Sequence, residues 1–342
     1  MRDLQSYVDE EYLKTPEKAM RLYDGKTIEE VFPHVNKSQL ESRLKKLEAS
    51  RQAMLNERSG YVANIQKGTY LLWKAGLDEL EQFIGLNLDW GTKLITEFKT
   101  KESPEIKNLF VALIKNHSRA CLISEEILHL LKGGFPDAAF ARWRSLYEIA
   151  VTGTFISLHG ETCAEAYLDH EVIDALKCHQ LEREIQVARG IKQQSSCCFK
   201  DRETDCQEML EKHGDAFKRP FGWAAAALKQ KNPQFKDLEE GIGQDHMRVF
   251  YKRASHKIHA SANGISTSLG TQSFGMSAPM LRAPSHEGLR DPAILCAHSL
   301  SQISAVVTTL FNKAECLIEM NVFDAFVNMI ERTFDRLLEQ KL

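Results

Sequence analysis

The chain is poor in the residues that interrupt helices. Its 342 residues include only 19 glycines and 9 prolines, below the usual combined share of about 12%. Because glycine and proline supply most turns, this shortage argues against a turn-rich β-protein and favours long helices. The chain is 43% hydrophobic and 27% charged, which is ordinary for a globular protein, and its length suits one large domain or two.

A strong net charge and a long apolar run are also lacking. The 44 basic and 47 acidic residues give a net charge of −3, which provides no strong field for nucleic acid but leaves room for a local basic patch. The richest apolar stretch, residues 149–158, is interrupted by Thr, Gly and Ser. A spanning helix needs ~18 or more apolar residues in a row, so we expect no contact with a membrane.

The first residues contain no apolar segment of the kind found in secretory signals. We therefore expect a cytoplasmic protein whose eight cysteines are reduced. One group of cysteines and histidines could in principle bind zinc: Cys178, His179, Cys197, Cys198, Cys206 and His213. Its spacing matches no short Cys-x2-Cys motif, and the glycine pairs at 133–134 and 241–243 lack the surroundings of a phosphate loop. We predict neither a metal site nor another cofactor.

The apolar pattern predicts an all-α protein with an N-terminal extension, residues 1–60, and a main helical domain, residues 61–342. A capping box at Ser38-Gln39-Leu40-Glu41 begins one amphipathic helix, which is expected to end near Ser59-Gly60. Its apolar stripe includes Leu40, Leu44 and Leu47, which suits a helix lying on a partner surface, such as another protein.

The main domain is predicted to be a helical bundle followed by two extra C-terminal helices. Pro104 and Pro136 mark helix starts and Gly133-Gly134 marks a stop. Residues 264–291 are rich in Ser, Gly and Pro and are predicted to be a flexible loop. Residues 192–218 are expected to hold one short helix. The other predicted helices cover residues 68–86, 104–132, 136–158, 162–188, 221–229, 244–262, 291–320 and 322–340.

A charged pair stands out on the predicted helix at 136–158. Arg144 and Glu148 are four residues apart and therefore share one face. The helix is apolar nearly all round, which predicts a central position. Charges on such a helix are costly unless they are compensated, so the pair is either a structural ion pair or part of a functional site.

The helix predicted at 244–262 is the most informative segment. Four of its residues fall within about 60° of one another on a helix, namely Arg248, Lys252, Ser255 and His259. Tyr251 adjoins this stripe, whereas Arg253 and His256 point elsewhere. Arginine and lysine can hold a phosphate and histidine can transfer a proton near neutral pH. The stripe therefore suits anion binding, and the alternative is a solvated basic face with one core histidine.

The segment Arg253-Ala-Ser-His-Lys-Ile-His259 resembles the Arg-x4–6-His signature of the HEPN superfamily, all-helical proteins that include metal-independent ribonucleases of toxin and antiphage systems. Arg144-x3-Glu148 together with Tyr251-x3-Ser255-x3-His259 also resembles a bacterial helical family of unknown function. These likenesses cover roughly residues 109–264. The superfamily resemblance implies a ribonuclease, with His256 in the place of the polar residue that these nucleases often carry shortly after the arginine.

Three functions fit these residues. In a ribonuclease, His259 would act as general acid or base and Arg253 would stabilise the charged phosphorane. Arg248, Tyr251, Lys252, Ser255 and His256 would bind the substrate. The alternatives are a non-catalytic helical sensor or scaffold that binds a ligand or partner, and a small-molecule enzyme that uses Arg144, Glu148 and His259 inside the bundle.

The spacing of Arg253 and His259 also predicts a homodimer. Six residues along a helix place two side chains about 120° apart, so one chain cannot easily direct both at a single phosphate. A two-fold interface brings the same helix of each subunit together and can form one composite groove. We therefore expect residues 244–262 near the axis of a homodimer that binds RNA.

Overall fold

The computed structural model describes residues 37–101, 104–190, 197–259, 262–267 and 284–340, and the chain divides into the units 1–63 and 64–342. All regular structure in these residues is helical, which confirms the predicted all-α class. Helix α4 (Lys37–Lys101) continues through Ser59 and Gly60, so the predicted helix end there is wrong. A glycine inside a helix costs only about 1 kcal/mol, which a long helix tolerates. Leu40, Leu44 and Leu47, in the described part of the first unit, are exposed.

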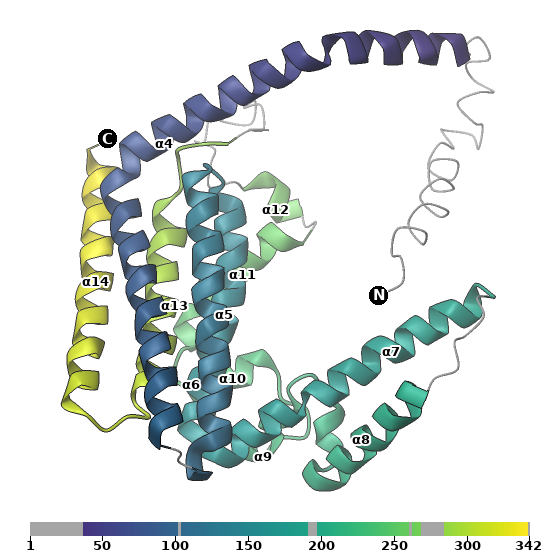
Figure 1. Ribbon diagram of the computed structural model, residues 1–342, viewed down its shortest axis with the longest axis vertical. Coiled ribbons are helices and arrows are strands. Elements are labelled where there is room, and N and C mark those ends of the chain that lie inside the picture. The colour runs from purple at the N-terminus through teal and green to yellow at the C-terminus, as the bar shows by residue number, and fades with distance from the viewer. Residues whose placement is uncertain (1–36, 102–103, 191–196, 260–261, 268–283, 341–342) are drawn as a thin grey trace. The chain divides into compact units, whose positions relative to one another are not determined.

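Five long helices form the bundle of the second unit (Figure 1). They are α4 from residue 64 onward, α5 (Lys107–Lys132), α6 (Pro136–Asp169), α13 (Arg290–Thr308) and α14 (Ala314–Glu339). Large apolar side chains fill the space between them: the ring of Trp73 on α4 stacks on Phe334 of α14, with centroids 5.4 Å apart. Trp143 of α6 donates a 3.0 Å hydrogen bond to the hydroxyl of Ser299 on α13. Buried indole N–H groups therefore find partners across the bundle.

The central helix α6 begins at the predicted proline and is interrupted at the predicted stop. The sequence indicates a stop at His159-Gly160, and Gly160 is not helical: two helical segments meet there at a kink, and the second continues to Asp169. The helix predicted at 162–188 is therefore divided after residue 169. Gly160 has a φ of +77°, a conformation that glycine adopts without steric cost. The following helices are α7 (Glu171–Ala188) and α8 (Cys197–His213). The end of α7 at residue 188 agrees with the prediction.

The boundary between the last two helices also differs from the prediction. The sequence pattern places it at residues 320–322, but α13 ends at Thr308 and α14 begins at Ala314. Lys313 is extended, and Phe311 in the connection is buried. Apolar residues therefore continue through the break and hide it from a search for helical periodicity.

Short helices and turns connect α8 to the region predicted as the helix 244–262. They include the 3-10 turns Asp215–Lys218 and Gly222–Ala224, α9 (Ala225–Leu228), α10 (Phe235–Gly241) and a 3-10 turn, η5 (Asp245–Met247). The helix predicted at 244–262 is divided into η5, α11 (Arg248–Ile258) and α12 (Ala262–Ser266). The flexibility predicted for 264–291 concerns mainly residues 268–283, which lie outside the described residues. None of the described helices is long and apolar enough to cross a membrane.

Candidate functional site

Helix α11 has one face against the bundle and one face in solvent. Tyr251 and Ala254 are buried on the inner face, whereas Lys252 and Arg253 are exposed on the outer face. Its sequence, RVFYKRASHKI, contains four cationic side chains and no acidic residue. The solvent face of α11 is therefore a local basic surface on a chain with a slightly negative net charge.

A three-residue network joins the inner face of α11 to α6. Arg144 Nε donates to Glu148 Oε1 at 3.1 Å, and Arg144 Nη2 donates to the hydroxyl of Tyr251 at 2.7 Å. The same hydroxyl donates to Glu148 Oε1 at 2.6 Å, and the guanidinium carbon lies 4.6 Å from the centre of the Tyr251 ring. The predicted pair of Arg144 and Glu148 therefore exists, and its charges are compensated by each other and by Tyr251.

Tyr251 keeps its proton in this network. Burial, followed by the hydrogen bond to Glu148, raises the pKa of its hydroxyl to about 12, although Arg144 opposes the rise. A hydroxyl with this pKa stays neutral near pH 7 and can donate to the carboxylate. Tyr251 is thus suited to holding α11 on α6, and unsuited to taking a proton from a substrate.

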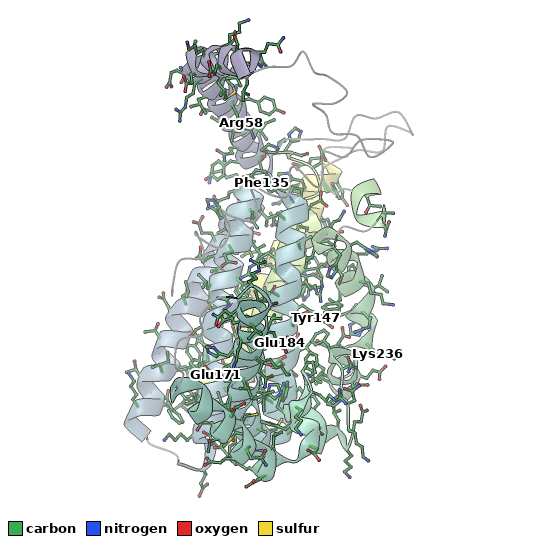
Figure 2. All side chains as sticks on the ribbon, turned by 90° about the vertical axis from the view of Figure 1, so that its right-hand side faces the viewer. Arg58, Phe135, Tyr147, Glu171, Glu184 and Lys236 are labelled. Atoms are coloured by element: carbon green, nitrogen blue, oxygen red, sulfur yellow. The ribbon has the colours of Figure 1, made fainter. Side chains whose placement is uncertain are left out.

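A second polar cluster lies next to the first network, at the N-terminal end of α11. It surrounds a carboxylate that solvent does not reach. Glu239 of α10 is 0% exposed and forms a salt bridge with Arg248 of α11. The hydroxyl of Tyr147 on α6, labelled in Figure 2, lies 3.1 Å from Glu239 Oε1 and 3.3 Å from the carbonyl oxygen of Gln244. Burial and Glu239 raise the pKa of Tyr147. Arg248, expected to bind substrate, is therefore held by a buried acid.

Sequence reasoning missed Glu239 as a site residue and placed Tyr147 only by its helical face. Tyr147 and Trp143 are four residues apart and share one face of α6, where their rings stack 5.3 Å apart. Glu239 is 92 residues from Tyr147, and no spacing within α10 indicates that its carboxylate is buried. A long-range contact of this kind leaves no periodic signal.

The predicted polar stripe is interrupted at its C-terminal end. Helix α11 ends at Ile258, and His259 has an extended backbone with φ −91° and ψ 143°. The expectation that His259 continues the helical stripe of Arg248, Lys252 and Ser255 is therefore wrong. Gly264 packs on the end of α11, where an added Cβ would lie 2.0 Å from the carbonyl oxygen of His256. His259 is exposed just beyond the helix end.

The remaining candidates on α11 divide between the two faces. The Ser255 hydroxyl, which is partly buried, donates to the carbonyl oxygen of Tyr251 at 2.9 Å. His256 is partly buried. The neighbouring Lys257 lies 2.9 Å from Asp137 at the start of α6, which fastens the C-terminal end of α11. Lys252, Arg253 and His259 are thus the candidates that are exposed to solvent.

The structure therefore defines a helical bundle whose central helix holds a short basic helix by two ion networks. Residues 110–276 match the model of a family of unknown function (DUF5677). This confirms that the segment with the Arg-Glu and Tyr-Ser-His motifs resembles a family of unknown function, whereas the HEPN resemblance stays a prediction. Searches of the curated proteins and of the solved structures find no match.

Proposed function

We propose that the protein is a metal-independent ribonuclease of a bacterial toxin or antiphage system, acting in the cytoplasm as a homodimer. The observation that supports this best is the solvent face of α11. Lys252 and Arg253 are exposed there, His259 is exposed just beyond the helix end, and α11 itself contributes no carboxylate. Cations close to an accessible imidazole suit an RNA phosphate, because they provide charge stabilisation and proton transfer at one place.

The proposed reaction needs only these side chains. His259 accepts the proton of the ribose 2′-OH, whose oxygen attacks phosphorus. The bond to the 5′-oxygen breaks, and a protonated imidazole returns a proton to that oxygen. Arg253 stabilises the charged phosphorane, and Lys252 holds a neighbouring phosphate. The products are a 2′,3′-cyclic phosphate and a 5′-hydroxyl.

The buried networks support this assignment because their task is to orient α11, which is separate from the proposed catalysis. Arg144, Glu148 and Tyr251 bond to one another, and they fix which face of α11 meets solvent. A small-molecule site built from Arg144, Glu148 and His259 gains no support from the cavity of about 620 Å³ beside the start of α11, because other side chains line it.

Two contacts with other chains belong to the proposal. Arg253 of one subunit and His259 of the other form each half of a composite groove across a two-fold axis. Residues 1–60 bind a partner protein through the helix that exposes Leu40, Leu44 and Leu47. Both contacts use surfaces that are solvent-exposed in the described single chain.

The test is cleavage of labelled RNA by the purified full-length chain, with and without a chelator. We expect cleavage in both conditions and products with 2′,3′-cyclic phosphate ends. Arg253→Ala and His259→Ala should each lower the rate by a factor of about 100 or more without lowering the melting temperature. The matched controls are Arg332→Ala and His179→Ala, since Arg332 is exposed on α14 and His179 is partly exposed on α7.

Two results would contradict the proposal. Absence of cleavage with intact RNA binding would favour the sensor or scaffold hypothesis. Cleavage that survives both α11 variants would place the active site elsewhere. A monomer that still cleaves RNA would leave the reaction in place and exclude the composite groove.

A further inference from the structure

A cavity of about 620 Å³ lies beside the start of α11. Its walls come from α13, α14, the turn η5 and the first turn of α11. Ligand sites for small molecules usually have volumes of roughly 300–1,000 Å³. The cavity therefore has the size of a small-molecule site, and Arg144, Glu148, Arg253 and His259 are not among its lining residues.

One wall of the cavity is apolar. Val327 of α14 and Ile294 and Leu295 of α13 line it and are less than 9% exposed. Met247 and Phe250 complete this wall from the side of α11. An apolar ligand body that covered these side chains would remove further apolar surface from water, which stabilises binding by about 25 cal/mol per Å².

The cavity also offers an acceptor without a donor. Gln244 lines it, and its Oε1 atom is buried and accepts no hydrogen bond within the described part of the chain. A buried acceptor in this state costs roughly 1–3 kcal/mol. Protein atoms cover this oxygen, so a ligand N–H or O–H group would recover that cost once the Gln244 side chain turns toward the cavity.

The charge of the walls is negative. The carboxylates of Asp291, Asp324 and Glu331 line the cavity, against the guanidinium of Arg290. His246 and His298 also line it, and His298 Nε2 lies 3.8 Å from Glu331 Oε2. Arg290 already pairs with Asp291 and with Asp335. The acidic residues of α14 stand seven positions apart, and therefore on the same face of the helix. An anion would meet this negative wall, whereas a cation would be attracted to it.

We propose that this cavity binds a small organic cation, an amine that carries an apolar aromatic or aliphatic body. Its ammonium group lies beside Asp324 and Glu331, and its apolar body covers Val327, Ile294 and Leu295. An N–H group of the ligand donates to Gln244. The proposal does not depend on ribonuclease activity, because it uses a different set of side chains.

The test uses phenethylamine with the full-length chain, measured by titration calorimetry. Two ligands of similar shape serve as controls: neutral phenethyl alcohol and anionic 3-phenylpropionate. We expect saturable binding of phenethylamine with a dissociation constant of about 1 mM or below. Both controls should bind at least tenfold more weakly. Tighter binding of the anion, or no saturation by phenethylamine at about 10 mM, would overturn the proposal.

Variants locate the binding site. Asp324→Asn and Glu331→Gln each remove one charge from partly or fully exposed positions, and each should weaken phenethylamine binding at least threefold. Asn328→Trp leaves both carboxylates in place and should block the cavity, which Asn328 lines from α14. Glu171→Gln on α7 is the matched control and should change nothing. Unchanged affinity in all three cavity variants would place binding elsewhere and refute the assignment.

Discussion

Tyr251 and Glu148 are separated by 103 residues and joined by a hydrogen bond of 2.6 Å between the tyrosine hydroxyl and Glu148 Oε1. Arg144 donates to the same hydroxyl at 2.7 Å, so this hydroxyl accepts a hydrogen bond from a cation and donates one to an anion. This bond connects α11 to the central helix α6. The phenolic group of Tyr251 is therefore one of the contacts that position the basic surface, beside the ion pairs of Arg248 and Lys257.

We predict that Tyr251→Phe lowers the free energy of unfolding by about 1–3 kcal/mol, because Arg144 and Glu148 each lose a partner while partly buried. Urea denaturation measures this change. Tyr70→Phe is the matched control: Tyr70 is exposed and bonds to Asp78 at 3.3 Å, so its loss should cost less than about 0.5 kcal/mol. Equal effects of the two substitutions would contradict the described network.

The buried carboxylate of Glu239 gives a second prediction. Glu239→Gln removes the charge that compensates Arg248, whose side chain is 28% exposed, and should lower the free energy of unfolding by about 2–4 kcal/mol. The adjacent Glu240→Gln is the control. Glu240 pairs with Lys236 at 2.9 Å on the surface, and surface pairs contribute about 0–1 kcal/mol.

The double variant Glu239→Gln with Arg248→Met checks the cause. Removal of both charges should recover part of the loss, since neither residue is then left as an unpaired ion. Chemical denaturation of the three variants completes the cycle. A double variant less stable than the sum of the two single changes would show that the salt bridge is not the source of the effect.

The sequence predicted those features of the fold that local chemistry controls. Proline at position 136 begins α6, and α5 ends at Lys132, just before a glycine pair. Boundaries that depend on tertiary packing were misplaced. The sequence pattern ends a helix at Gly60, whereas α4 continues through it, and the connection before Lys313 keeps apolar residues such as Phe311 buried. A helix breaker indicates where a helix can end, whereas packing decides whether it does.

The candidate site shows the same limit. The spacing of four residues placed Arg144 and Glu148 on one face, and the structure confirms that they bond. It could not show that Tyr251 reaches both of them, because that contact depends on how α11 packs on α6. It also predicted one helix over residues 244–262, whereas α11 ends at Ile258 and Gly264 packs closely on its end. Local spacing predicts which side chains share a helix face, and long-range packing decides which face is buried.

A third prediction concerns pH and His117 of α5. This histidine is 2% exposed, and its Nε2 lies 3.1 Å from the hydroxyl of Ser304. Burial lowers the pKa of His117 from 6.5 to about 4, so the unfolded chain binds a proton between these pH values and the folded chain does not. The contribution of the neutral His117 to the free energy of unfolding is therefore complete above pH 6.5, and it is lost as the pH falls toward 4.

The measurement is the free energy of unfolding of the wild type and of His117→Gln at about pH 7.5 and pH 4.5. Over this interval the wild type should lose about 2–3 kcal/mol more than the variant. The difference between the two proteins removes the effects of the other titrating groups. The same pH dependence in both proteins would show that His117 is protonated in the folded state.

The last prediction compares two glycines in the part of α4 that belongs to the bundle. Gly76 packs against Phe334 of α14, and a Cβ at this position would lie 2.6 Å from Cε2 of the ring. Phe334 is 0% exposed and stacks on Trp73, so the ring has little room to move. Nothing lies within 4 Å of a Cβ built on Gly85. The two positions therefore separate steric packing from helix propensity.

Gly76→Ala should lower the free energy of unfolding by about 1–3 kcal/mol, because the added methyl group forces α4 and α14 apart. Gly85→Ala should raise it by about 0.5–1 kcal/mol, since alanine is favoured over glycine inside a helix. Thermal and urea unfolding of both variants measure the two changes. A stabilised Gly76→Ala variant would mean that α4 and α14 pack less closely than described. A destabilised Gly85→Ala variant would show that this side of α4 is covered in the folded protein.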